Sequence, residues 1–494
     1  MIFSSWVFAV FFAVVYSAYW ALPSRRGRHV FLLLASYAFY MSWDVWLVGL
    51  IAGSTLLDYC VGRALEVAEG RRRRQALLVL SIAGNLGILC AFKYADFFIV
   101  SLRELVRAAG VQSNLDTLGF ILPIGISFYT FQTLSYTIDV YRRKIEPTRN
   151  VLEFALFVAF FPQLVAGPIV KAREFLPQLA ERKRFEWRRL ESGIVLFMVG
   201  LTKKILIADN LAMLVDPVFA DPQSFVTRDL WIAMFCYGGQ IYCDFSGYSD
   251  MAIAIAGVLG YDLPRNFASP YLAVGLSDFW RRWHISLSTW LRDYLYIPLG
   301  GSRLGRLLTY RNLMITMLLG GLWHGASWTF VVWGGLHGAA LVVCRLLSGV
   351  VGEPASSVPN TPFLSRGVRR FVPWVLTLLA VHIAWVFFRC QPIMLSDTLA
   401  QETTAAALAR AGYFVKHLFV PASVDAALWL PDKAPMLALL ALMFAMQLYS
   451  EWTRRGRPRP VLPAPLTGLG YAAWIVALVV FSAENVAPFI YFQF

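Results

Sequence analysis

The sequence predicts an all-α protein that crosses a membrane many times, and three observations carry this prediction. Of its 494 residues, 58% are hydrophobic and only 15% are charged, whereas roughly a quarter are charged in an average soluble domain. Apolar runs recur along almost the whole chain, at lengths near the roughly 20 residues that span a bilayer. They leave no room for a large soluble domain, which excludes a cytosolic enzyme, a disordered regulator and a disulfide scaffold.

The chain is strongly basic, with a net charge of +14. Its Lys and Arg residues lie in the loops between the apolar runs, which is typical of the cytoplasmic side of a membrane protein. We therefore expect a lipid bilayer around the protein and no nucleic-acid partner. The six cysteines lie in or beside apolar segments and form no CxxC pair, which favours buried hydrophobic side chains over a metal site or disulfides.

The basic clusters orient the first spans. No basic residue precedes the apolar run at 1–22, and arginines follow it at 25–28. We therefore place the N-terminus outside and these arginines in the cytoplasm. The run at 30–60, interrupted at 42–44, is expected to form a hairpin that returns to the basic cluster at 71–74.

The next elements continue this alternation. We expect residues 75–92 to lead out, 96–110 to form an amphipathic helix at the interface, and 120–140 to return to the basic residues at 142–144. The apolar stretch at 151–170 contains two prolines and a glycine. Such residues at membrane depth are typical of a re-entrant or broken helix buried in protein.

The remaining spans bring the predicted total to ten or eleven. A basic stretch at 171–189 is expected on the cytoplasmic surface, and the arginines at 454–459 place the C-terminus outside. We treat residues 1–494 as one domain, with N-terminal helices (1–120), a core (121–345) and C-terminal helices with an aromatic tail (346–494). The later spans are predicted at 193–207, 230–259, 313–344, 371–388, 435–449 and 462–481.

His324 is the first candidate for chemistry. It lies in an apolar, glycine-containing stretch, residues 317–330, that carries no charged side chain. An ionisable group at membrane depth is a functional candidate, and desolvation keeps an imidazole neutral and able to act as a base. A core histidine hydrogen-bonded between helices is the plainer alternative. We assign that structural role to His337.

The segment 278–296 has helical periodicity, with an apolar stripe and a basic side. It is typical of an amphipathic helix at the cytoplasmic interface. Alternatively, Arg281 and Arg282, with Trp283, bind the phosphates of a cytosolic donor. His284 falls where the stripe meets the basic side and can face inward.

Asp244 and Asp250 lie inside a long apolar helix. A separation of six residues rotates the two side chains by about 600°, so they point in different directions unless Gly247 breaks the helix. We expect each to pair with an arginine or to cap a helix end, and a proton relay stays open.

Five runs resemble the membrane-bound O-acyltransferase (MBOAT) family, and in particular its bacterial alginate O-acetylase-like branch. This resemblance implies a helical bundle around a central tunnel, with His324 as the catalytic histidine and His284 as the family's second histidine. It also implies transfer of an acyl group from a cytosolic thioester to an extracytoplasmic hydroxyl. The runs are FYTFQ (128–132), FPQLVAGP (161–168), DFSGYSD (244–250), FWRRWHISLSTWLRDY (279–294) and LWHGA (322–326).

The resemblance implies a membrane O-acetyltransferase. Acetyl-CoA, or another acyl thioester on a carrier, enters past Arg281 and Arg282, and His324 takes the proton from the acceptor hydroxyl. No bound cofactor and no metal are expected. Alginate, cellulose and peptidoglycan all fit as the final acceptor. A proton-coupled transporter using Asp244, Asp250 and His324, and a non-catalytic scaffold of a polysaccharide secretion complex, are the rival classes.

The C-terminal tail, residues 488–494, carries four aromatic side chains. One interpretation is an aromatic anchor at the outer interface. The other is that the tail folds back and presents Tyr491, because the pattern Phe489-x-Tyr491-x-x-Phe494 resembles a C-terminal motif of acyl exporters in this family. In that case Tyr491 relays the acyl group to a serine esterase-like transferase outside a bacterial inner membrane, within a polysaccharide biosynthesis complex.

Overall fold

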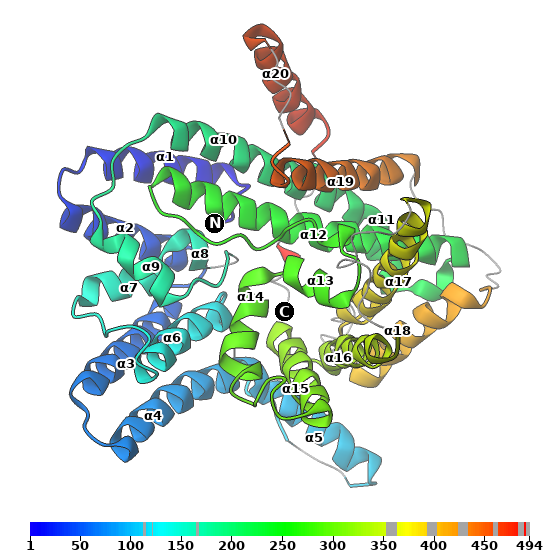
Figure 1. Cartoon of the computed structure of the whole chain (residues 1–494), viewed down its shortest axis with the longest axis horizontal. Coiled ribbons are helices and arrows are strands. Elements are labelled where there is room, and N and C mark those ends of the chain that lie inside the picture. The colour runs from blue at the N-terminus through cyan, green and yellow to red at the C-terminus, as the bar shows by residue number, and fades with distance from the viewer. Residues whose placement is uncertain are drawn as a thin grey trace. The chain divides into compact units, whose positions relative to one another are not determined.

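The computed structural model is built from helices, and its described residues contain no strand (Figure 1). The structure describes residues 1–111, 115–120, 122–164, 167–351, 363–392, 403–422, 433–457, 463–482 and 489–490. The chain forms two compact units. The first comprises Met1–Val199 and Tyr248–Arg265, and the second comprises Gly200–Gly247 and Asn266–Phe494.

The first unit contains the N-terminal helices and the end of α12. Its elements are α1 (Trp6–Ala21), α2 (Arg25–Met41), α3 (Leu47–Val67), α4 (Arg71–Leu89), η1 (Cys90–Tyr94), α5 (Ala95–Ala108), α6 (Ile126–Tyr141), α7 (Val151–Ala159), α8 (Phe161–Leu164), α9 (Ala172–Ala180) and most of α10 (Trp187–Leu201).

The second unit contains every described candidate site residue except Asp250. Its elements are η2 (Thr202–Ala208), α11 (Asp209–Ala220), η3 (Pro222–Ser224), the first part of α12 (Thr227–Val258), η4 (Pro270–Leu272), α13 (Leu276–Arg282), α14 (Ile285–Leu291), η5 (Arg292–Tyr296), α15 (Arg306–His324), α16 (Trp328–Val351), α17 (Phe363–Arg389), α18 (Thr404–Phe419), α19 (Lys433–Arg454) and α20 (Ala464–Val480).

Several helices are long and apolar enough to cross a membrane. Five described stretches meet this criterion, and two shorter apolar helices, Trp6–Ala21 and Ala464–Val480, accompany them. The predicted all-α, multi-pass membrane class is therefore confirmed, whereas the count of ten or eleven spans stays a prediction. The five stretches are Leu47–Val67, Arg71–Ala108, Trp328–Leu347, Arg370–Arg389 and Lys433–Arg454.

Two predicted irregular segments can be compared with the structure. The helix expected at 96–110 is present as α5, and it continues from α4 through η1 as one stretch of 38 residues, Arg71–Ala108. Its place at the membrane interface stays a prediction. Between α4 and α5 the helix passes through a π-helical turn at Cys90–Tyr94 and does not end there. The predicted break within 151–170 is confirmed, because α7 ends at Ala159 and the short α8 follows.

A buried carboxylate ties α3, α4 and α6 together in the first unit. Asp58 is fully buried, and its oxygens accept hydrogen bonds from Asn85 Nδ2 at 2.7 Å, from Thr137 Oγ1 at 2.8 Å and from Ser81 Oγ. Buried polar groups are tolerated where such partners satisfy them. The polar residues of these helices therefore stabilise the packing.

Replacing Asp58 with leucine should lower the free energy of unfolding by about 3 kcal/mol, because three buried donors lose their acceptor. Thermal unfolding of the purified protein in detergent measures this change. Asp58→Asn keeps one acceptor oxygen and should cost less. Equal stability of the leucine variant and the parent protein would contradict the structural role of Asp58.

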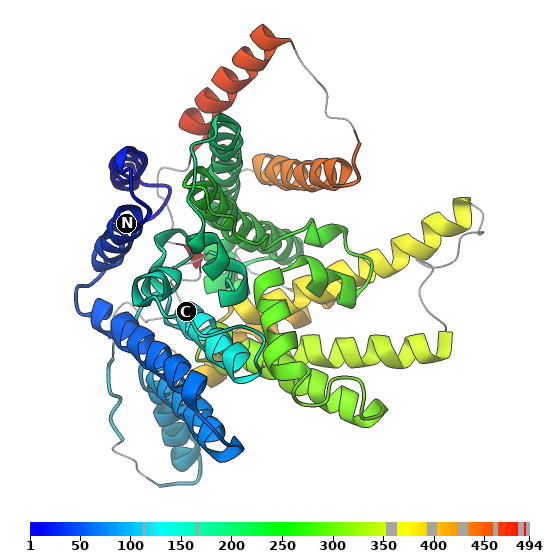
Figure 2. The ribbon, with the colours of Figure 1, turned by 60° about the vertical axis from the view of Figure 1, so that its left-hand side comes forward.

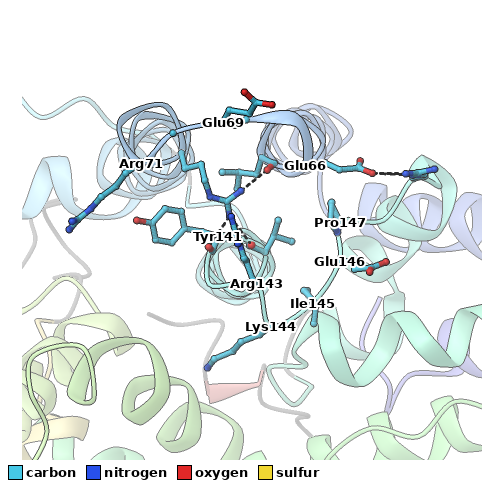
Figure 3. A pocket seen from close by; sticks show the side chains of 15 residues that line it. Glu66, Glu69, Arg71, Tyr141, Arg143, Lys144, Ile145, Glu146 and Pro147 are labelled. Carbon is cyan, nitrogen blue, oxygen red and sulfur yellow. Dashed lines mark hydrogen bonds and ion pairs between the residues drawn. The ribbon is translucent and has the colours of Figure 1, made fainter.

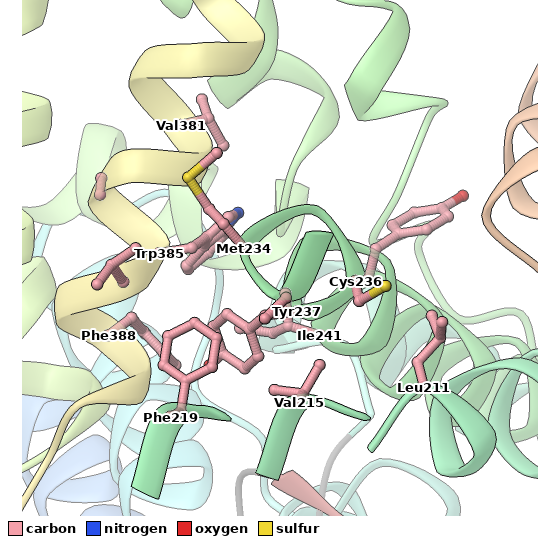
Figure 4. Packing of buried hydrophobic residues seen from close by; sticks show 14 of the residues in the cluster. Leu211, Val215, Phe219, Met234, Cys236, Tyr237, Ile241, Val381, Trp385 and Phe388 are labelled. Atoms are coloured by element: carbon pink, nitrogen blue, oxygen red, sulfur yellow. The ribbon is translucent and has the colours of Figure 1, made fainter. Parts of the chain in front are cut away.

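The core of the second unit is aromatic and aliphatic, and Figure 4 shows part of it. The ring of Phe219 on α11 lies 5.3 Å from that of Tyr237 on α12, and Trp385 and Phe388 of α17 belong to the same cluster. Helices α15 and α16 pack against each other, and α16 also packs against α17 (Figures 1 and 2). This packing holds α15, which carries His324, against the core.

Candidate active site

His324 is the last residue of α15 and is only 3% exposed. Aromatic rings surround its imidazole, with ring centroids 5.1 Å away for Trp323, 5.1 Å for Trp333 and 5.2 Å for Phe388. The ring of His284 lies 6.3 Å away. The structure therefore brings the two predicted histidines together in a buried aromatic setting.

Glycines fix the position of α15 against α16. A Cβ added to Gly321 would overlap the carbonyl oxygen of Phe330, and one added to Gly334 would overlap that of Met317. Only glycine allows the two backbones to approach so closely. The glycine at position 321 of this stretch therefore permits the close packing of the helix that ends at His324.

On the prediction that His324 is catalytic, Gly321→Ala should reduce activity at least tenfold, because separating α15 from α16 displaces His324, and small displacements of a catalytic group have large effects on rate. Gly335→Ala is the matched control, since its added Cβ would meet only Leu318 Cδ2 at 3.6 Å, an ordinary contact. The rate of acyl transfer, the activity that the sequence resemblance implies, and thermal unfolding of both variants measure the difference. Equal rates in the two variants would contradict this account.

His284 occupies a left-handed turn and not a continuous helix. The helix predicted over 278–296 was wrong at this point, because α13 ends at Arg282 and α14 begins at Ile285. His284 has φ 42° and ψ 56° and is fully buried. A non-glycine residue in this conformation is strained, and such strain is typical of functional sites.

Asn266 explains the turn and fixes the protonation of His284. The Asn266 Oδ1 atom accepts from Ser286 Oγ at 2.8 Å and from the Ser286 backbone N–H at 3.3 Å, and it lies 3.2 Å from His284 Nδ1. An amide oxygen only accepts, so Nδ1 carries the hydrogen and Nε2 keeps its lone pair. Burial lowers the pKa of His284 to about 3, so the ring is neutral at pH 7.

The predicted donor-binding residues lie in different surroundings. Arg281 is exposed. Arg282 Nε donates to Asp278 Oδ1 at 2.9 Å, and Arg282 Nη1 donates to Glu451 Oε2 at 3.3 Å. Trp283 is fully buried, with its ring 4.9 Å from that of Trp385. Their role in donor binding stays a prediction.

Asp244 pairs with a lysine, and the expectation of an arginine partner was wrong for this residue. Lys204 Nζ lies 2.7 Å from Asp244 Oδ1 and 2.8 Å from Asp209 Oδ1. Helix α12 is continuous through Gly247, so Asp244 and Asp250 point in different directions, as the spacing indicates. Sequence reasoning missed Lys204 and Asp209, although a charged residue within the apolar run 193–207 was a usable signal.

Two residues of the C-terminal tail are described, and both are buried. Ile490 donates its backbone N–H to Asp244 Oδ2 at 2.8 Å. The ring of Phe489 lies 5.8 Å from that of Phe245, which in turn lies 4.7 Å from the ring of His284. Tyr491 lies outside the described residues.

His337 lies on α16 and is 2% exposed. Its ring centroid is 4.9 Å from Trp333 and 5.1 Å from Trp280. Trp333 thus contacts both His324 and His337. Within the described ranges, no three His, Cys, Asp or Glu side chains are grouped so that they could hold a metal ion.

A pocket lies elsewhere, in the first unit (Figure 3). Its volume is about 1320 Å³ and its lining mixes basic and acidic side chains. Arg74 uses its guanidinium to hold the carbonyls of Leu65 and Tyr141, and Arg149 pairs with Glu66. No candidate residue from the sequence lines this cavity, so it is not the candidate active site.

Comparison with known proteins identifies the family. Residues 32–385 match the model of the MBOAT, membrane-bound O-acyltransferase family. A probable alginate O-acetylase of Pseudomonas aeruginosa is 44% identical over 80% of this chain and 73% of its own length. Its counterpart in Pseudomonas putida is 39% identical over the full length of both chains.

A more distant relative has a different name. The peptidoglycan O-acetyltransferase of Helicobacter pylori is 37% identical over 77% of this chain and 75% of its own length. The family match covers well over half of the chain and includes both histidines. The chain is therefore an acyltransferase that belongs to the membrane-bound O-acyltransferase family.

Proposed function

We propose that this acyltransferase moves an acetyl group from a cytosolic thioester donor to a hydroxyl of an extracytoplasmic polysaccharide. The observation that carries the proposal is the buried pair of histidines, His324 and His284, within 6.3 Å of each other among aromatic rings. The names of the relatives, alginate O-acetylase and peptidoglycan O-acetyltransferase, support an acetyl group and a polysaccharide acceptor.

His324 acts as the general base in this proposal. Its imidazole takes the proton from the hydroxyl that receives the acetyl group first, which is the phenol of Tyr491. The phenol oxygen attacks the thioester carbonyl, and the tetrahedral intermediate expels the thiolate. The proton held by the imidazole then passes to the leaving sulfur. The aromatic rings of Trp333 and Phe388 exclude water from the imidazole, which protects the thioester from hydrolysis.

His284 orients the donor. Because its Nδ1–H is directed to Asn266, its Nε2 offers only a lone pair. This atom therefore accepts a hydrogen bond from the donor, for instance from an amide of its pantetheine arm, and does not polarise the carbonyl oxygen. Arg281, the exposed one of the two arginines, contacts the phosphates of acetyl-CoA or of an acyl carrier.

Tyr491 takes the acetyl group first and presents it outside the membrane. The burial of Phe489 and Ile490 in the second unit supports a tail that folds back. Both termini face the periplasm, and a serine esterase-like transferase of a polysaccharide complex at the inner membrane accepts the group from Tyr491. The names of the two Pseudomonas relatives, both probable alginate O-acetylases, support alginate as the acceptor.

The test is acetyl transfer from labelled acetyl-CoA by the purified protein, with His324→Ala as the negative variant. The proposal predicts label on the protein or on an added polysaccharide, and transfer that is at least about a hundredfold slower with the variant. Accumulation of substrate in vesicles that depends on a proton gradient would instead indicate a transporter. No transfer from acetyl-CoA, with transfer from an acetylated carrier protein, would correct the donor.

A further inference from the structure

Three buried charged side chains of the second unit form a compact cluster. Lys204, Asp209 and Asp244 are 2%, 4% and 2% exposed, respectively. The single ammonium group of Lys204 lies 2.8 Å from Asp209 Oδ1 and 2.7 Å from Asp244 Oδ1. One positive charge therefore faces two carboxylates, and a buried carboxylate needs further donors to offset its lost hydration.

The C-terminal tail supplies one of these donors. The backbone N–H of Ile490 lies 2.8 Å from Asp244 Oδ2, the oxygen that Lys204 does not contact at this distance. Ile490 is 4% exposed and Phe489 is 1% exposed. A main-chain donor is independent of the side chain, so this bond holds the tail by its backbone.

The helix before the tail is held by the same part of the chain. Trp474 Nε1 of α20 donates to Thr202 Oγ1 at 2.7 Å. Asn210 Nδ2 donates to the carbonyl of Phe481, just after α20, at 2.9 Å. Residues 202–210, which include Lys204 and Asp209, therefore contact α20 and the residue that follows it, Phe481.

We propose that Lys204, Asp209 and Asp244 form a binding site for the backbone of the C-terminal tail, which we call the seat. The seat fixes the positions of Phe489 and Ile490 beside the active site. Lys204 Nζ contacts Oδ1 of Asp244, which leaves Oδ2 to accept the hydrogen bond from the N–H of Ile490. The seat places Phe489 against Phe245, and Phe245 packs against His284. The three residues are positioning residues, and only their effect on acyl transfer rests on the proposed function.

Labelling of a cysteine in the tail tests the seat directly. In a background with the exposed Cys60, Cys90 and Cys344 changed to serine, Ile490→Cys keeps the backbone N–H. We expect a thiol reagent to label this cysteine slowly in the full-length protein in detergent. Asp244→Ala should speed the labelling at least tenfold, and Asp244→Asn, which keeps an acceptor oxygen, should have a smaller effect.

The matched control is Asp229→Ala. Asp229 is also buried, lies on the same helix α12 and pairs with Lys433, but it has no bond to the tail among the described contacts. This variant should leave the cysteine at position 490 shielded. A labelling rate that Asp244→Ala does not change, or an equal acceleration by Asp229→Ala, would overturn the proposal.

Activity gives a second measurement that leaves the cluster intact. Ile490→Pro removes the backbone N–H, whereas Ile490→Val keeps it, so the proline variant should lose at least tenfold more acyl transfer than the valine variant. Combining Ile490→Pro with Asp244→Ala should add little to either single loss, and additive losses would contradict a shared interaction. The labelling result requires no acyl transfer, so the seat and the proposed function can fail separately.

Discussion

Replacing His324 with alanine or glutamine is expected to lower acyl transfer by about 10²–10⁴-fold, the usual contribution of a general base. The protein should remain folded and in the membrane, because the aromatic rings around His324 also pack against one another. Trp333 and Phe388, for example, have ring centroids 5.2 Å apart. Turnover of labelled acetyl-CoA per mole of folded protein measures the loss.

His382→Gln is the matched control for this experiment. His382 is another buried histidine of the second unit, 3% exposed, and its Nδ1 lies 2.7 Å from the carbonyl of Leu378 on its own helix. Its replacement removes an imidazole of similar burial away from His324. Wild-type turnover in His324→Ala, or an equal loss in His382→Gln, would refute the assignment of the base.

Tyr491→Phe is expected to abolish acetylation of the polymer while the protein level stays normal. The variant keeps the aromatic ring and removes only the hydroxyl. A phenol, with a pKa of about 10, gives up its proton to His324 more easily than a sugar hydroxyl does, and its ester is activated for the next transfer. Mass spectrometry of the C-terminal peptide, from cells that lack the proposed external transferase, should detect an acetyl adduct on Tyr491.

Tyr471→Phe serves as the comparison, because Tyr471 lies on α20, outside the tail, and is 44% exposed. The Tyr471→Phe variant should acetylate the polymer at the normal level. Normal acetylation in Tyr491→Phe would exclude the relay and leave the tail as an aromatic anchor.

The fold class could be predicted because apolar runs report directly on burial in a bilayer. The number of spans is harder, since a helix such as α6 buries Gln132, Thr133 and Asp139 inside the protein and departs from a uniform apolar pattern. The continuity of Arg71–Ala108 could not be predicted either, because a π-helical turn leaves no simple mark in the sequence.

In the candidate site, too, local sequence predicts some residues but not the contacts between residues that lie far apart in the chain. His324 is recognisable from its local sequence, because it is an ionisable side chain among apolar and small residues. The turn at His284 depends on Asn266, 18 residues earlier, and no local periodicity contains that contact. Asp244 pairs with Lys204. Because 40 residues separate them in the chain, no helical periodicity in the sequence could predict this pair.

The left-handed backbone of His284 shows that the side chain at this position stabilises the protein as well as serving the site. A non-glycine residue in this conformation costs roughly 1–2 kcal/mol, which glycine would avoid. Glycine would, however, leave a cavity where the fully buried imidazole packs against Phe245 and Trp323, and such losses from a core cost about 2–5 kcal/mol. Selection for heat resistance alone would therefore retain a ring at position 284, so a screen for thermostability would not discard the imidazole in favour of glycine.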